Sequence, residues 1–328
     1  MDICWIRWFG CEVFRNKPDK VRRVRIMPVR SALTKSTSLV FSALCLIWGS
    51  SWLAIKVGLN ILPPFSFAGM RFAVASLFLL FSLPLFHVKF PRDSFSWGIM
   101  ILLGVLQVAL AYGLLFWGEQ YTSSGLAAVL SATFPFFVIL GTGLIKTERA
   151  TRRNVGGTLV AFLGVGLMFW RSLLPGQGSA EPSLLGTIAI VGSAASTGIG
   201  TVIVKKYASR IHPAMNTLVQ SAVGSIALAF VGLATEKDSG LAFAPIAVVA
   251  VLYLGVIGTA LAFVGWYWLI NETTAINSSL ILLITPVIAV LLGCLILQEQ
   301  LDSPALLGTI LILSGVYLTL QRNGRILP

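Results

Sequence analysis

Residues 135–164 read PFFVILGTGLIKTERATRRNVGGTLVAFLG, and residues 286–315 read PVIAVLLGCLILQEQLDSPALLGTILILSG. Equivalent residues recur at a constant spacing of 151: Pro135 and Pro286, Glu148 and Glu299, Gly157 and Gly308, Gly164 and Gly315. The same spacing continues upstream without a gap, to pairs such as Gly104 with Gly255 and Trp117 with Trp268. The chain is therefore an internal duplication, and the nature of one copy decides the fold of both.

The composition indicates a membrane protein. Of the 328 residues, 56% are hydrophobic and 11% are charged, and the mean hydropathy is +0.89. Soluble domains carry roughly 25% charged residues. Several apolar runs reach the ~20 residues that cross a bilayer as a helix. Runs such as 102–118 and 280–297 do not alternate apolar and polar residues, which disfavours an outer-membrane β-barrel. We therefore predict an all-α membrane protein.

Proline, glycine and polar clusters divide the chain into ten predicted spans. These are 37–57, 65–86, 95–117, 123–145, 153–171, 184–205, 213–234, 244–269, 274–297 and 304–321. The predicted domains are a basic arm (1–36), a first five-helix repeat (37–171), a linker (172–183) and a second five-helix repeat (184–321). The arm holds nine Lys and Arg residues. It has two open interpretations: a polybasic segment that binds anionic lipid, or untranslated sequence, with the true start at Met27.

Charge sets the predicted orientation. With the N-terminus in the cytoplasm, 20 of the 24 Lys and Arg residues fall on the cytoplasmic side, as the positive-inside rule requires. The net charge of +12 then reflects membrane topology, and no nucleic-acid-binding module is apparent. Because five spans is an odd number, the second copy has to enter the membrane from the opposite face. Inverted repeats of this kind are typical of secondary transporters that work by alternating access.

The chain resembles the drug/metabolite transporter superfamily, and within it the EamA-type ten-helix exporters, from Ser38 to Leu320. The residues that carry the resemblance are Trp48-Gly49-Ser50-Ser51, Arg71 and the duplicated Pro, Glu and Gly positions. The resemblance implies ATP-independent export of amino acids or small metabolites across the bacterial inner membrane. One departure is that the family often has Gly before each Glu, where Thr147 and Gln298 stand here.

Arg71 is the candidate substrate-binding charge. It lies inside the second predicted span, and a charge at that depth usually faces protein or a water-filled cavity. One interpretation is that Arg71 holds a substrate carboxylate. The other is a structural bond to a carbonyl, or a side chain that extends to the lipid headgroups. Lys56, at the outer end of the first span, is close enough to water to extend to it.

Polar and aromatic residues deep in the spans predict the rest of a cavity for a zwitterion or a neutral polar solute. They are Trp48, Ser51, Gln107, Tyr112, Ser131, Thr197, Thr201, Trp266, Asn277 and Ser278. For each of them the alternative is an interhelical hydrogen bond, or an aromatic anchor at the membrane surface.

The duplicated residues have predicted structural or gating roles. Pro135 and Pro286 lie in mid-span and should kink their helices, either for gating or for packing. The carboxylates of Glu148 and Glu299 should interact favourably with the positive N-terminal end of the next helix. The alternative is a role in proton coupling. Gly157 and Gly164 are seven residues apart, as are Gly308 and Gly315, so each pair shares one helix face and allows close packing.

Residue patterns that are missing from the sequence narrow the range of possible functions. The first span lacks the buried carboxylate that small multidrug pumps of the superfamily use, which disfavours proton-coupled cation export. Multidrug or cation efflux remains the alternative, followed by a non-transporting sensor or assembly protein. The two His and four Cys residues form no catalytic or metal-ligand spacing, so we predict no enzyme activity, metal or cofactor. The expected partners are a small-molecule substrate and the lipid bilayer, with the protein a monomer or homodimer.

Overall fold

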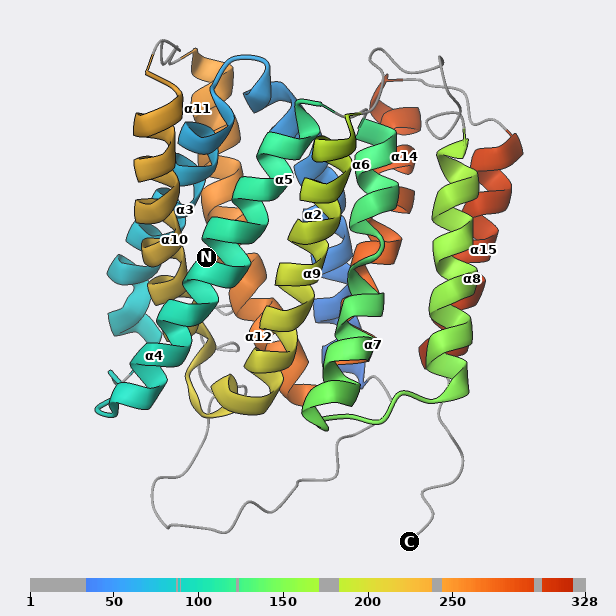
Figure 1. Ribbon diagram of the computed structural model, residues 1–328, viewed down its shortest axis with the longest axis horizontal. Helices are drawn as coiled ribbons and strands as arrows, with labels where there is room; N and C mark the ends of the chain where they lie inside the picture. Colours follow the sequence, from blue (N-terminus) through green and yellow to red (C-terminus); the bar gives the residue numbers. More distant parts are fainter. Residues whose placement is uncertain are drawn as a thin grey trace, which may run out of the picture.

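The computed structural model describes residues 34–86, 88, 90–121, 124–170, 183–237, 244–297 and 303–320. Every regular element in these ranges is a helix. The helices lie side by side and run in roughly one direction across the molecule (Figure 1). The prediction of an all-α fold is therefore confirmed. The basic arm up to residue 33, the linker at 171–182 and Glu299 lie outside the described residues.

Each copy contains five helical units. In the first copy these are α2 (Lys35–Leu59), α3 (Pro64–Ser82), the continuous set α4 (Ser94–Leu103), η2 (Gly104–Leu110) and α5 (Ala111–Glu119), the pair α6 (Ser124–Ser131) and α7 (Phe134–Ile145), and α8 (Arg152–Met168). In the second they are α9 (Leu184–Tyr207), α10 (Pro213–Thr235), the set α11 (Pro245–Leu252), η5 (Tyr253–Leu261) and α12 (Ala262–Glu272), the pair α13 (Ala275–Ser279) and α14 (Ile281–Leu297), and α15 (Ser303–Leu320). Short turns of 3₁₀ helix, η1 (Leu83–Phe86) and η4 (Ala208–Arg210), follow α3 and α9.

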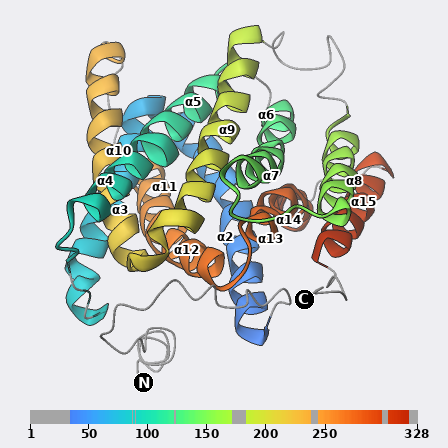
Figure 2. The same ribbon diagram turned by 60° about the horizontal axis from the view of Figure 1, so that its bottom comes forward.

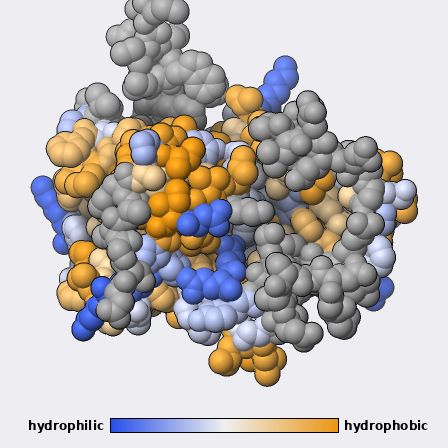
Figure 3. All heavy atoms as spheres, turned by 90° about the horizontal axis from the view of Figure 1, so that it is seen from above, coloured by the Kyte–Doolittle hydropathy of each residue, from blue (hydrophilic) through white to orange (hydrophobic). Residues whose placement is uncertain are grey.

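Nine of these units, counted within the described residues, are long and apolar enough to cross a membrane. The remaining one, α8, has 17 residues, at the lower limit for a spanning helix. Large apolar side chains lie exposed on the outer faces, among them Phe81, Leu144 and Leu233. Seen from above, hydrophobic residues reach the rim at several points (Figure 3). Since water disfavours such a surface, these faces contact lipid.

Local sequence explains where the helices begin. Thr34 and Thr151 cap α2 and α8, each with a capping box, and Asp93 caps α4 by accepting a hydrogen bond from Ser96 N. A proline starts α3, α10 and α11, where its missing N–H has no partner to lose.

The duplication is visible in the helices themselves. Both long third spans contain a π-helical segment, η2 and η5, at equivalent places. The sequence analysis predicted ordinary α-helix there. π-Helical segments are rare and are frequent at functional sites. Their occurrence in both copies therefore makes these two spans candidates for a functional role.

The proline-containing spans differ between the copies. The fourth span breaks between α6 and α7, and Pro135 lies in the first turn of α7. A helix start tolerates proline, so the expected mid-helix kink at Pro135 is replaced by a break. Pro286 does lie inside α14, but that span breaks at Leu280 instead.

Helix contacts extend the duplication to residues upstream of the 151-residue repeat. A Cβ built on Gly49 would meet Ile288, and one built on Gly198 would meet Phe137. Phe137 and Ile288 are equivalent residues, so Gly49 and Gly198 are equivalent too, now at a spacing of 149. By this spacing Arg71 corresponds to Gln220. The sequence analysis did not find this, because few identities survive in this part of the copies.

The two copies are interlocked. The first helix of each copy packs against the third and fourth spans of the other: α2 contacts α12 and α14, while α9 contacts α5 and α7. Helices α3 and α10 pack together, and so do α8 and α15. The last pair lies side by side at one edge of the molecule (Figures 1 and 2). The space between the copies is therefore walled by both of them.

Helices α8 and α15 meet at the duplicated glycines. A Cβ on Gly164 would lie 2.7 Å from the Gly308 carbonyl oxygen, and one on Gly308 would lie 2.6 Å from that of Gly164. Gly157 and Gly315 oppose each other in the same way. Since residue numbers rise along one helix as they fall along the other, these two equivalent helices run antiparallel.

Candidate functional site

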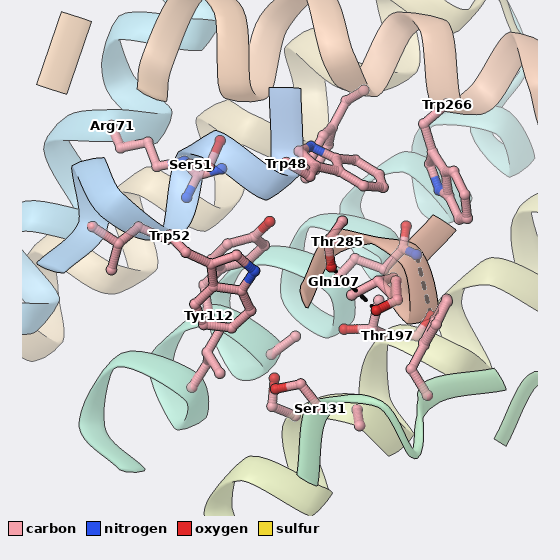
Figure 4. Close-up of a pocket in the computed structure, with 18 of the residues that line it drawn as sticks. Trp48, Ser51, Trp52, Arg71, Gln107, Tyr112, Ser131, Thr197, Trp266 and Thr285 are labelled. Atoms are coloured by element: carbon pink, nitrogen blue, oxygen red, sulfur yellow. Dashed lines mark hydrogen bonds between the residues drawn. The ribbon is translucent and has the colours of Figure 1, made fainter. Parts of the chain in front are cut away.

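A cavity of about 120 Å³ lies between the two copies. Figure 4 shows its residues, with Arg71 on one side of the view and Trp266 and Thr197 on the other. The lining residues are Trp48, Ser51, Trp52, Ile55, Arg71, Gln107, Ala111, Tyr112, Leu115, Ser131, Phe134, Ser193, Ala194, Thr197, Phe263, Trp266, Tyr267, Leu282 and Thr285. They come from both copies, and their one formal charge is that of Arg71.

Arg71 is held across the boundary between the copies. Its side chain is 2% exposed. From α3 of the first copy, its Nε donates to Thr259 Oγ1 at 2.8 Å and its Nη2 donates to the Gly258 carbonyl at 3.3 Å. Both acceptors belong to the π-helical segment η5 of the second copy. The guanidinium carbon also lies 4.9 Å from the centroid of the Tyr112 ring, a favourable cation–π distance.

Arg71 retains donor capacity toward the cavity. A guanidinium has five N–H groups, and two of them make these hydrogen bonds. The buried Nη1 has no hydrogen-bond partner among the described residues. An unpaired buried donor of this kind is unfavourable.

Aromatic rings form much of the remaining wall. Trp48 and Trp266 lie with ring centroids 5.3 Å apart, and Phe134 lies 6.4 Å from Trp266. The Trp48 indole Nε1 donates to the Gly258 carbonyl at 3.2 Å, so Trp48 and Arg71 share that acceptor. The wall therefore offers apolar ring faces, and a hydrogen bond fixes the orientation of one of them, Trp48.

A buried polar network connects the copies on another wall. The Tyr267 hydroxyl lies 2.8 Å from Gln107 Oε1 and 2.7 Å from Gln220 Oε1. Gln107 Nε2 donates to the Thr197 carbonyl and to Thr201 Oγ1, each at 3.3 Å. The network ties η2, α9, α10 and α12 together, and Gln220 Nε2 has no hydrogen-bond partner among the described residues.

The predicted site residues divide into two groups. Those that line the cavity are Trp48, Ser51, Arg71, Gln107, Tyr112, Ser131, Thr197 and Trp266. Thr201 lies directly behind the wall and accepts the hydrogen bond from Gln107. Asn277 and Ser278 are absent from the lining. They lie in the short helix α13, where Asn277 N donates to Thr274 Oγ1 and Ser278 Oγ bonds to Thr273 Oγ1. Both residues lie near the start of this span, before the helix break at Leu280.

The lining also contains residues that the sequence analysis did not select, including Trp52, Phe134, Ser193, Phe263, Tyr267 and Thr285. Ser193 precedes Thr197 by one helical turn and Trp52 follows Trp48 by one turn, so helical spacing from those two residues was a usable signal. Thr285 is a polar residue inside the predicted span 274–297, so the criterion that selected the other polar residues could have found it.

Glu148 binds a helix other than the expected one. Its carboxylate accepts from Ala275 N at 2.8 Å and from Ile276 N at 3.3 Å, at the start of α13 in the second copy. The expectation was the start of α8, the next helix in sequence, but Thr151 caps that helix.

Two homologous halves around a small buried cavity are the arrangement of many membrane transporters. More particularly, the chain belongs to the EamA-like transporter family, whose model matches residues 35–170 and 184–321. This confirms the resemblance found in the sequence, and makes the protein a transporter and not an enzyme.

Relatives carry transporter names. The chain is 30% identical over 280 residues to an uncharacterized transporter of Bacillus subtilis, YoaV, covering 83% of this chain and 92% of YoaV. It is 28% identical over 284 residues to a probable amino-acid metabolite efflux pump of Escherichia coli, covering 83% and 90%. A solved crystal structure matches with a TM-score of 0.75 at 17% identity, covering 88% of this chain and 99% of that one. The last similarity shows the fold alone.

Proposed function

We propose that this transporter exports small carboxylate solutes, amino acids and related zwitterions first among them, across the cell's inner membrane by alternating access. The observation that carries the proposal is Arg71, a buried cation that lines the cavity with one nitrogen unpartnered. A substrate carboxylate would provide both the missing charge and the missing acceptors. Arginine binds carboxylates through two parallel hydrogen bonds, and the free N–H groups of Arg71 suit that geometry.

The other walls fit the rest of such a solute. Trp48, Trp266 and Tyr112 offer ring faces to an apolar side chain, while Ser51, Ser131 and Thr197 offer oxygens near them. A cavity of about 120 Å³ is smaller than the ~300–1,000 Å³ of drug-sized sites. With a cation and no acidic residue in its described lining, the cavity favours a metabolite over a cationic drug. The printed name of the Escherichia coli relative supports the same substrate class.

Alternating access requires two copies that can exchange roles across the membrane. We infer that the repeats are inverted, with both termini in the cytoplasm. The antiparallel crossing of α8 and α15 supports this, as do the charges of two equivalent loops: four basic residues lie between Lys146 and Arg153, and none lies in 298–303. Rocking of one copy against the other would then expose the cavity to each side in turn.

Transport in proteoliposomes tests the role of Arg71. We expect Arg71→Ala nearly to abolish transport of a carboxylate substrate, and Arg71→Lys to weaken it, because lysine keeps the charge but loses the fork. Loss of a charged hydrogen bond of about 1.5–3 kcal/mol raises the apparent substrate constant roughly 10- to 150-fold. Arg153→Ala, which removes an exposed arginine at the start of α8, is the matched control and should behave as wild type. Unchanged kinetics in Arg71→Ala would refute the proposal.

A further inference from the structure

The turn between α12 and α13 is held by two charged side chains from other elements. Lys205, near the end of α9, donates its ammonium to the carbonyl oxygens of Ile270, at 2.7 Å, and of Thr273. These carbonyls belong to the last turn of α12, where unpaired C=O groups carry the negative end of the helix dipole. A lysine at this position therefore binds the C-terminus of α12.

Glu148 makes the complementary contact. Its two carboxylate oxygens accept from the first two backbone N–H groups of α13, at the positive end of that helix. Lys146, which ends α7, has a φ of 55°, and this left-handed turn brings the chain round to Glu148. Burial raises the pKa of Glu148, while the bonds from Ala275 and Ile276 and the nearby Lys205 act to lower it.

The two contacts lie just beyond one end of the cavity. Tyr267 and Leu282 line the cavity, and Ile270 and Ile276 lie three and six residues further toward this end. At 1.5 Å per residue these contacts are about 5–9 Å past the lining. Of the two contacts, only that of Glu148 joins the copies, because Glu148 belongs to the first and the α12–α13 turn to the second. Lys205 and its two acceptors all belong to the second copy, so Lys205 holds the turn itself. Relative movement of the copies at this end has to break the bonds of Glu148.

We propose that Glu148 and Lys205 form an interlock that keeps the cavity closed at this end of the bundle, and that its release is a step of the transport cycle. This rests on the proposed alternating access but not on the identity of the substrate. If small residues replaced Lys205 and Glu148, the ends of α12 and α13 would have no charged partner from these two positions. Lys205 fixes the turn, and the bonds from that turn to Glu148 are the ones that link the copies in the closed state.

A matched carboxylate exists at the opposite end. Glu236, at the end of α10, accepts from Phe65 N at 2.7 Å and from Ser66 N at 2.9 Å, at the start of α3. Its chemistry is the same as that of Glu148, a carboxylate on a helix N-terminus. Since it lies away from the α12–α13 turn, its removal should not open the Lys205 end.

Thiol accessibility tests the interlock without any substrate. The reporter is Thr285→Cys, at a lining position that is 1% exposed, in protein whose native Cys residues are replaced. Intact cells and inverted membrane vesicles present the two ends separately to a membrane-impermeant maleimide. We expect Glu148→Ala and Lys205→Met each to raise the labelling rate from the Lys205 end by about tenfold or more. Glu236→Ala should not raise it.

Equal labelling from the Lys205 end in wild type, Glu148→Ala and Lys205→Met would overturn the proposal. A second variant protects the test against misfolding of those substitutions. Glu148→Cys combined with Ala275→Cys should form a disulfide on oxidation that stops transport, and reductant should restore it. Full transport by fully cross-linked protein would also overturn the interlock. Transport by Arg71→Ala tests the proposed substrate binding, and the labelling rates test the interlock. The two proposals can therefore fail separately.

Discussion

The two copies agree where their helices cross and differ in the side chains that line the cavity. Equivalent glycines are retained where helices cross: Gly49 and Gly198, Gly157 and Gly308, Gly164 and Gly315. Residues that line the cavity differ from their equivalents in the other copy. In the alignment of the copies, Arg71 corresponds to Gln220, Trp48 to Thr197, Phe134 to Thr285 and Tyr112 to Phe263. The duplication thus gives a symmetric frame, and the site lies where the symmetry is lost.

The most consequential difference is between Arg71 and Gln220. Gln220 is fully buried and hydrogen-bonded to Tyr267, and it is absent from the lining. Arg71 is almost as buried but reaches the cavity. One copy therefore brings the charge, and the other brings the acceptors in η5 that hold it. The proposed anion site therefore needs both copies, and substitutions that make them alike should remove it.

The largest effect is expected from the symmetric frame. Gly157→Ala places a methyl group against the backbone of α15, and overpacking of this kind costs about 1–3 kcal/mol. We expect a lower melting temperature and less folded protein, measured by fluorescence-detected size exclusion. Gly156→Ala is the control, because a Cβ there meets no atom within 4 Å. Helix propensity alone favours Ala over Gly, so equal losses in both variants would show that the crossing is not responsible.

Arg71→Gln gives the first copy the residue of the second. The side chain keeps hydrogen-bonding groups but loses the charge, so transport of a carboxylate should weaken by roughly 10- to 150-fold in apparent substrate constant. Normal abundance in the membrane separates this from misfolding. If the variant transports as wild type, the charge difference between the copies has no part in binding.

Thr259→Val makes the second copy resemble the first, where Val108 is the equivalent residue. Valine has nearly the shape of threonine but cannot accept from Arg71 Nε. Loss of this bond should raise the apparent substrate constant by about 2- to 10-fold, and Thr259→Ser should restore it. A structural role alone would lower the protein level and leave the constant unchanged.

Tyr267→Phe also copies the first repeat, which has Phe116 at the equivalent position. It removes the hydroxyl that lies between Gln107 and Gln220. The expected loss of stability is about 1–3 kcal/mol, since buried amide groups lose a partner. The effect on transport should be the smallest of the four. Thermal unfolding in detergent measures the loss of stability. A melting temperature equal to that of wild type would show that the hydrogen bonds of Tyr267 do not stabilise the fold.

Much of the fold could be predicted because its signals are strong. Long apolar runs, breakers such as Pro63-Pro64 and the 151-residue repeat fix the helices to within a few residues. The π-helical segments could not be predicted, since their residues are compatible with α-helix and tertiary contacts decide the extra residue per turn. The break at Leu280 was missed because Pro286 gave a stronger signal in the wrong place.

Site residues could be predicted where the chemical group is rare inside a membrane span, and could not be predicted where the group occurs in every residue. Arg71 is conspicuous, being a charge inside a span, and the cavity includes it. A bond from Arg71 to a carbonyl was one of the two interpretations, and the structure shows it. The acceptors themselves, the Gly258 carbonyl and Thr259, were not predicted, because a backbone carbonyl has no sequence signal. The target of Glu148 was missed for a related reason: a carboxylate indicates a helix N-terminus without indicating which one.

The central claim is that a substrate carboxylate binds Arg71 between the copies. Its most direct test compares each L-amino acid with its own amide, which keeps the side chain and the amine but lacks the carboxylate. Counterflow in proteoliposomes should show wild-type protein preferring the acid by about tenfold or more, and Arg71→Gln showing no preference. If wild type exchanges acid and amide equally well, Arg71 does not bind a carboxylate and the account is wrong.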